Sequence, residues 1–173
     1  SRTDKVIPIA DNIAVTMAGT VSDAQLVTKL IKAELNLIKI RNSREPTLKE
    51  SANLLAGMVY QNIRKMSMIP GIAHFIIGGK DETGHSVYDI FPDGSIQEVD
   101  DFISSGSGSV FAYGVLETHY KSEMTVDQGV KVAVKAINTA LKRDSASGNG
   151  VNVFTITSEG MKKLTPKVLS VEL

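Results

Sequence analysis

The apolar residues of this chain change their spacing in blocks, and this change constrains the fold most. Residues 6–17 alternate as in short strands, residues 26–66 follow helical spacing, and residues 72–99 return to strand-like runs. A second helical stretch, 111–141, precedes a strand-like run from Val151. Because strands and helices come in groups, the order predicts an α+β domain with antiparallel sheets and two helix pairs.

The strand-like runs predict a hairpin, a three-stranded meander and a closing pair. The expected strands are Val6–Ile9, Ile13–Met17, Ile72–Ile77, Ser86–Phe91, Ser95–Val99, Val151–Thr157 and Lys163–Val171. Asp11 and Asn12 form the turn of the hairpin, and Pro8 predicts an edge position or a bulge in its first strand.

The first helix pair is predicted from two apolar faces. The expected buried residues of the first helix step by four, three, four and three: Leu26, Leu30, Ala33, Leu37 and Ile40. Those of the second are Leu48, Ala52, Leu55, Val59, Ile63 and Met66. Segment 42–46 ends the first helix, Thr47 and Glu50 form a capping box for the second, and Pro70 and Gly71 stop it.

The second helix pair is shorter. Phe111–Tyr120 is expected to form its first helix, and Thr125 and Gln128 cap the next one. The apolar face of that next helix comprises Val130, Val134, Ile137 and Leu141.

Composition excludes several function classes. Residues 1–173 are long enough for one domain, and 19 basic residues balance 19 acidic ones, so no charge field favours nucleic acid. The chain has no cysteine, no run that spans a bilayer, and three histidines without ligand spacing. We therefore expect neither a metal nor a cofactor, and a cytoplasmic location.

Two polar loops carry the candidate chemistry. Ser105–Ser109 is a Gly-Ser loop ahead of a helix, which is either a weak anion cradle or only a tight turn. Residues 143–148 place an acid, two hydroxyls and a glycine after a helix. Asp144 at a helix C-terminus meets an unfavourable dipole, and Lys5 is the cation nominated to compensate it.

Several ordered pieces of the chain resemble β-type proteasome subunits, most closely the archaeal kind. The matching pieces are Ala18–Gln25, Lys32–Leu35, Ile76–Gly79, Ser105–Ser109, Tyr113–Glu117 and Lys142–Gly148. The resemblance implies the four-layer αββα sandwich of the N-terminal-nucleophile hydrolases, with antiparallel sheets. It covers essentially the whole chain as one domain.

The resemblance also implies a catalytic set. In that family an N-terminal threonine attacks the peptide carbonyl, and its own α-amine is the base. Lys5 falls on the lysine that lowers the proton affinity of the amine, and Ser107, Asp144 and Ser147 fall on the groups that orient it. Gly19 falls on the backbone donor of the oxyanion hole.

Further positions match the substrate channel of the family. Gly19 and Val21 are expected to pair with an extended substrate backbone. Met17 is expected to line the pocket for the residue before the cut, with Val21 beside it and Thr3 and Ile7 as weaker candidates. A pocket lined by methionine favours apolar or aromatic side chains.

The nucleophilic threonine of the family is absent from this sequence. Only four residues precede Lys5, and the register places Ser1 ahead of the lysine strand rather than on the strand of the nucleophile. The expectation is therefore a subunit without its first β-hairpin, whether cut, disordered or in an unprocessed form, and inactive by itself.

The leading hypothesis is a threonine endopeptidase subunit of the 20S proteasome core that degrades unfolded polypeptides. Its expected partners are other β subunits in a seven-membered ring, an α-subunit ring and, indirectly, an ATP-dependent unfoldase cap. A catalytically silent or unprocessed structural β subunit of the same particle is the alternative. A bacterial-type peptidase with an unfoldase and an unrelated anion-binding module remain less favoured.

Overall fold

The computed structural model describes residues 6–18, 21–65, 74–144 and 151–164, without the side chains of 21–24 and 62–65. The chain divides into two compact units. Residues 1–100 and 156–160 form the first, and residues 101–155 and 161–173 form the second. That the two units make up a single domain stays a prediction.

The first unit is built on a five-stranded antiparallel sheet in which neighbours in sequence are neighbours in space. Its strands are β1 (Val6–Ala10), β2 (Ile13–Ala18), β3 (His74–Asp81), β4 (Gly84–Ile90) and β5 (Ile96–Glu98). The hairpin and the meander are therefore confirmed. Pro8 is predicted at an edge position or a bulge: β1 is an edge strand of the described sheet, and its register with β2 shifts between Pro8 and Ala10.

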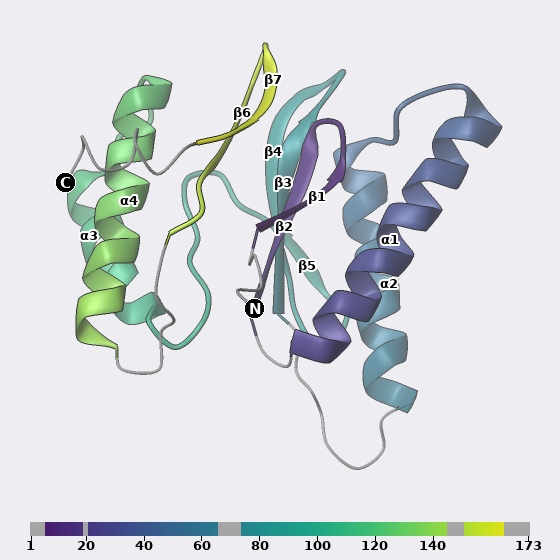
Figure 1. Ribbon diagram of the computed structural model, residues 1–173, viewed down its shortest axis with the longest axis horizontal. Helices are drawn as coiled ribbons and strands as arrows, with labels where there is room; N and C mark the ends of the chain where they lie inside the picture. Colours follow the sequence, from purple (N-terminus) through teal and green to yellow (C-terminus); the bar gives the residue numbers. More distant parts are fainter. Residues whose placement is uncertain (1–5, 19–20, 66–73, 145–150, 165–173) are drawn as a thin grey trace. The chain divides into compact units, whose positions relative to one another are not determined.

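Two helices cover one face of this sheet (Figure 1). Helix α1 (Val21–Asn42) packs on β1 and β2, and α2 (Leu48–Lys65) packs on β3, β4 and β5. The core lies between the helices and the sheet. Its fully buried side chains include Phe75, Ile77 and Ile90 from the strands.

The predicted buried face of α1 is wrong. Leu30 is 49% exposed and Ile40 67% exposed, and the other members of the predicted face are exposed as well. The residues that α1 buries against the sheet are instead Val27, Thr28, Ile31 and Leu35. Both sets have helical spacing, so α1 carries two apolar faces and the sheet covers only one of them.

The predicted face of α2 is confirmed at Leu48, Ala52, Leu55 and Val59, which are buried. The side chain of Ile63 and all of Met66 lie outside the described residues.

The capping of α2 differs in part from the prediction. The Glu50 N–H donates to the Thr47 hydroxyl at 3.1 Å, as expected. The Glu50 carboxylate, however, binds Arg44 through two hydrogen bonds of 3.2 and 2.9 Å. Asp81 at the end of β3 supplies the second cap, because its carboxylate accepts from the Leu48 N–H at 2.8 Å.

The second unit contains two packed helices, α3 (Ser109–His119) and α4 (Val126–Arg143). The predicted capping box of α4 is present in full, with Thr125 and Gln128 bonded reciprocally. The face of α4 differs in part from the prediction: Val130 and Val134 are buried, but Ile137 is exposed. The small residues Ala136 and Ala140 of α4 are buried as well, and so is Ala112 of α3. Among the described residues, no helix is long and apolar enough to cross a membrane.

The closing strands are shorter than predicted, and the second one comes earlier. They are β6 (Phe154–Thr157) and β7 (Gly160–Lys163), which form a two-stranded sheet. Gly160 takes a positive φ of 107° after the turn, a conformation suited to glycine. The tight turn therefore starts β7 before Lys163, and residues 165–173 lie outside the described part.

Candidate functional site

The Gly-Ser loop and the C-terminal end of α4 meet in the second unit. The Ser107 hydroxyl donates to Oδ2 of Asp144 at 2.5 Å, across 37 positions of sequence. Asp144 is the C-cap of α4 and has an extended backbone, and its N–H donates to the Ala140 carbonyl at 2.8 Å. A short hydrogen bond to a carboxylate is among the stronger side-chain contacts in proteins.

The loop that carries Ser107 is fixed at several points. The ring of Phe102 packs edge-on against Tyr120, with centroids 5.1 Å apart. The N–H of Ser104 donates to the Tyr113 hydroxyl at 3.1 Å. Gly106 turns the chain with φ 98°, and its carbonyl accepts from the N–H of Ser109 at 3.2 Å. These contacts give the Ser107 hydroxyl a defined position relative to α3.

This geometry limits what the site can bind. Because the Ser107 hydroxyl donates its proton to Asp144, its oxygen can still accept a hydrogen bond from another donor, such as an amine. A carboxylate at the loop disfavours an anion, which argues against the phosphate cradle. Lys142 and Arg143 in the last turn of α4 compensate the helix dipole near Asp144.

The predicted substrate-pocket residues divide between described and undescribed parts. Met17 is buried in the core cluster of the first unit, and Ile7 is partly buried against the same cluster. Val21 is the first residue of α1, and its side chain is outside the described part. The other expected site residues lie outside the described residues altogether: Thr3, Lys5, Gly19 and Ser147.

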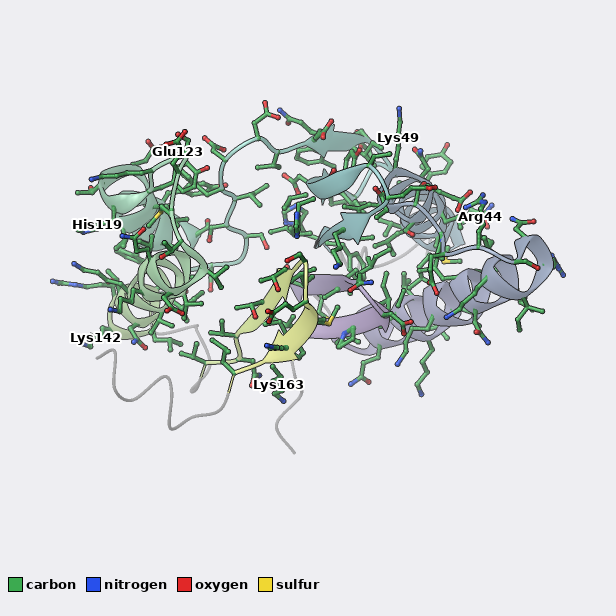
Figure 2. The ribbon with its side chains drawn as sticks, turned by 90° about the horizontal axis from the view of Figure 1, so that it is seen from above. Arg44, Lys49, His119, Glu123, Lys142 and Lys163 are labelled. Carbon is green, nitrogen blue, oxygen red and sulfur yellow. The ribbon has the colours of Figure 1, made fainter. Side chains whose placement is uncertain are left out.

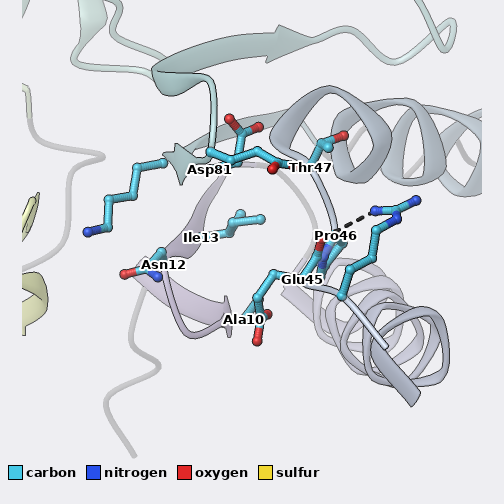
Figure 3. Close-up of a pocket in the computed structure, with 10 residues that line it drawn as sticks. Ala10, Asn12, Ile13, Glu45, Pro46, Thr47 and Asp81 are labelled. Carbon is cyan, nitrogen blue, oxygen red and sulfur yellow. Dashed lines mark hydrogen bonds between the residues drawn. The ribbon is translucent and has the colours of Figure 1, made fainter. Parts of the chain in front are cut away.

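The first unit has a pocket of about 330 Å³ that the sequence did not indicate. Its walls are the β1–β2 turn, the α1–α2 loop and the end of β3, and Figure 3 shows Asp81 beside Thr47 with Asn12 and Ala10 across from them. Several polar groups that line it have partners within the chain. Lys80, for example, donates to the Ser158 carbonyl at 3.0 Å. The polar residues around the pocket therefore connect neighbouring elements of the first unit, and we call this region the structural joint.

Asp81 is the central charge of that joint. Burial alone would raise the pKa of its carboxyl, but the hydrogen bonds that it accepts outweigh this effect and lower the pKa. The donors are the Thr83 hydroxyl at 2.6 Å, the Leu48 N–H at 2.8 Å, and the N–H groups of Thr83 and Gly84. Asp81 therefore ties the end of β3 to the start of α2.

A largely buried pair of His74 and Asp89 does not follow from the spacing of the histidines. The two residues are bonded through Nε2 and Oδ1 on neighbouring strands of the sheet. His119 has different surroundings from His74. Figure 2 shows it on the α3–α4 pair, where its ring is exposed and its Nε2 atom accepts a hydrogen bond from the Lys135 ammonium at 3.2 Å. The sequence signal that could have identified this pair is that His74 and Asp89 fall on neighbouring strands of the predicted meander.

Comparison with known proteins gives a consistent result. The model of a family described as "Proteasome subunit" matches residues 1–156. A "Proteasome subunit beta" of Ferroglobus placidus is 43% identical over 166 residues, which cover 96% of this chain and 77% of that protein. The same name is given to a relative from Archaeoglobus fulgidus, 42% identical over 94% of this chain and 75% of its own length. A relative of the same name from Methanothermobacter thermautotrophicus is 43% identical over 91% of this chain and 72% of its own length.

Proposed function

The chain belongs to the proteasome subunit family, and from this premise we propose that it is a β subunit of the 20S core with threonine endopeptidase activity. The observation that carries the proposal is the hydrogen bond between Ser107 and Asp144. It joins the two loops that the family resemblance assigns to the orientation of the nucleophile's amine.

The proposed chemistry requires the N-terminal threonine of the family, which has no matching residue within 1–173. Its α-amine takes the proton of its own hydroxyl, which then attacks the peptide carbonyl. Ser107, held by Asp144, accepts a hydrogen bond from that amine and fixes the direction of its lone pair. Ser147 assists this orientation, and the ammonium of Lys5 keeps the amine neutral.

The backbone N–H of Gly19 would stabilise the oxyanion that forms on the carbonyl oxygen, an interaction typically worth about 3 kcal/mol. Gly19 and Val21 would align the substrate as an added strand. Met17, with Val21 beside it and Thr3 and Ile7 as further members, would line the pocket for the residue before the cut and favour apolar side chains there.

The wider proposal concerns architecture and partners. The first unit, with α1 and α2 on one face of its sheet, would form half of a four-layer αββα sandwich, and α3 and α4 would supply the opposite outer layer. The subunit would work in the cytoplasm on unfolded polypeptides. Its partners would be other β subunits in a seven-membered ring, an α-subunit ring and, indirectly, an unfoldase cap.

The test uses the full-length protein in its assembled particle. The intact mass of the subunit is measured before and after treatment with a peptide epoxyketone, which reacts with a hydroxyl and a free α-amine together. We expect one inhibitor per subunit. An assembled particle that takes up none would support the silent or unprocessed structural subunit instead.

A variant pair links this test to the observed contact. Ser107→Ala should slow epoxyketone labelling about 10- to 100-fold, because a misdirected amine loses near-attack geometry. Thr118→Val is the matched control, since it removes a hydroxyl of the same unit that bonds the Gly114 carbonyl at 2.8 Å within α3. Equal labelling of both variants would contradict the proposed role of Ser107.

A further inference from the structure

The hydrogen-bonded pair of His74 and Asp89 lies on the sheet of the first unit, on the face away from α1 and α2. Phe75 and Ile90, the adjacent residues on β3 and β4, pair across the strands and are fully buried in the core under the helices. Because side chains alternate along a strand, His74 and Asp89 point to the opposite face. In the proposed fold, this is the face away from the outer helices.

The surroundings of the pair hold it in one geometry. The Asp89 side chain is 10% exposed and that of His74 is 23% exposed. Burying a carboxylate this far is costly unless a donor faces it, and the Nε2 atom of His74 is that donor. The imidazole also stacks on Phe91, with ring centroids 6.0 Å apart and planes inclined by 29°. Stacking restricts rotation of the ring and keeps Nε2 directed at Asp89.

The pair lies at the end of the β-ladder. His74 is the first residue of β3 and pairs with Ala18, the last residue of β2. Strand ends fray unless side chains tie them down. The cross-strand bond from His74 to Asp89 connects this end of β3 to β4, and so supports Ala18 through its pairing with β3.

Ala18 is followed directly in the sequence by Gly19, the proposed oxyanion donor. We propose that His74 and Asp89 are positioning residues for the peptidase reaction, because the hydrogen bond between them sets the position of the β2 end from which the chain continues to Gly19. This inference rests on the proposed function. It assigns a catalytic consequence to two residues that do not contact the substrate.

The experiment compares Asp89→Asn and His74→Gln with wild type in the assembled particle of the full-length chain, using a fluorogenic peptide. We expect kcat to fall about tenfold in each variant and KM to change less than about twofold, since an oxyanion donor acts mainly in the transition state. The double variant should lose no more than the single ones, because the two residues act as one unit.

The matched control is Arg44→Gln. It breaks the ion pair of Arg44 with Glu50, 2.9 Å long, which lies near Asp81 at the other end of β3. Its kcat should stay within about twofold of wild type. A fall in kcat that is equal in all three variants would indicate general destabilisation and would overturn the inference. Unchanged kcat in Asp89→Asn would overturn it as well.

Hydrogen exchange separates this inference from the proposed function. In the assembled particle, the peptide that contains Ala18 should exchange at least about fivefold faster in Asp89→Asn than in wild type or Arg44→Gln. A second outcome is that exchange is faster in Asp89→Asn while the wild-type particle neither cleaves peptides nor takes up epoxyketone. That combination would refute the proposed function and, with it, the catalytic consequence of the pair. Unchanged exchange would refute the positioning itself.

Discussion

The two units of the chain reach their packing in different ways. The largest fully buried side chains among the described residues belong to the first unit, with Phe75, Ile31 and Leu35 at the head of the set. Among the described residues, the second unit buries three alanines and two valines, and the valines pack against the partly buried Val153 and Leu164. Small residues let α3 and α4 approach closely but remove less apolar area from water. The first unit therefore holds most of the hydrophobic stabilisation, whereas the proposed orienting pair lies in the second.

Among the substitutions that test this contrast, Phe75→Ala is expected to have the largest effect on stability. The phenylalanine is fully buried between the sheet and both helices, and its removal leaves a cavity that rigid strands cannot close. We expect the free energy of unfolding to fall by about 3–5 kcal/mol. Urea denaturation followed by circular dichroism measures it, and a loss below about 1 kcal/mol would place the main core elsewhere.

The counterpart in the second unit is Val134→Ala. Val134 packs with Val130 against the partly buried Val153 and Leu164. Two methyl groups are removed from a thin cluster, so we expect a loss of about 1–2 kcal/mol in the same urea experiment. A loss as large as that of Phe75→Ala would remove the difference between the units.

Asp81→Asn tests whether the first unit also depends on a charge. The folded pKa of Asp81 is lowered, so its contribution is fully present above the unfolded pKa and is lost as the pH falls through the folded pKa. We expect the variant to lose about 1 kcal/mol at neutral pH, and the gap to wild type to close below about pH 4. A gap that is constant from neutral to acid pH would assign the loss to shape rather than to charge.

The smallest effect on stability is expected for Ile40→Lys on the outer face of α1. Ile40 is 67% exposed, so unfolding should change by less than about 0.5 kcal/mol. Recovery of assembled particles should nevertheless fall, because the lysine places a charge in the apolar stripe formed by the exposed residues Leu26, Leu30, Leu37 and Ile40. Native mass spectrometry quantifies the assembly. Asn36→Lys, at an exposed position on the same helix, controls for the added charge, and an equal effect of both would argue against a role for the stripe.

The grouping of elements, the hairpin and the capping box at Thr125 could be predicted from the sequence, because each depends on local spacing or turn chemistry. The buried face of α1 could not be predicted. The Leu26 and Val27 series have equally good helical spacing, and only the position of the sheet decides between them. Periodicity reports that a face is apolar, but it does not report what covers that face.

The candidate site shows the same limit. The meeting of Ser107 and Asp144 was expected from family resemblance, since nothing in the local sequence brings together residues 37 positions apart. The pair of His74 and Asp89 depends on the register of β3 and β4. A shift of one residue would turn one partner to the other face of the sheet and separate them.

Two adjacent glycines on β3 have opposite consequences for sequence change. A Cβ on Gly79 would collide with the Asn12 carbonyl oxygen and lie 2.9 Å from the Cα of Ile13, so the β1–β2 turn leaves no room for any side chain. A Cβ on Gly78 would meet only ordinary contacts, the nearest being Val87 Cγ2 at 3.6 Å. In a saturation-mutagenesis library, selection should therefore retain glycine alone at position 79 and admit alanine at position 78.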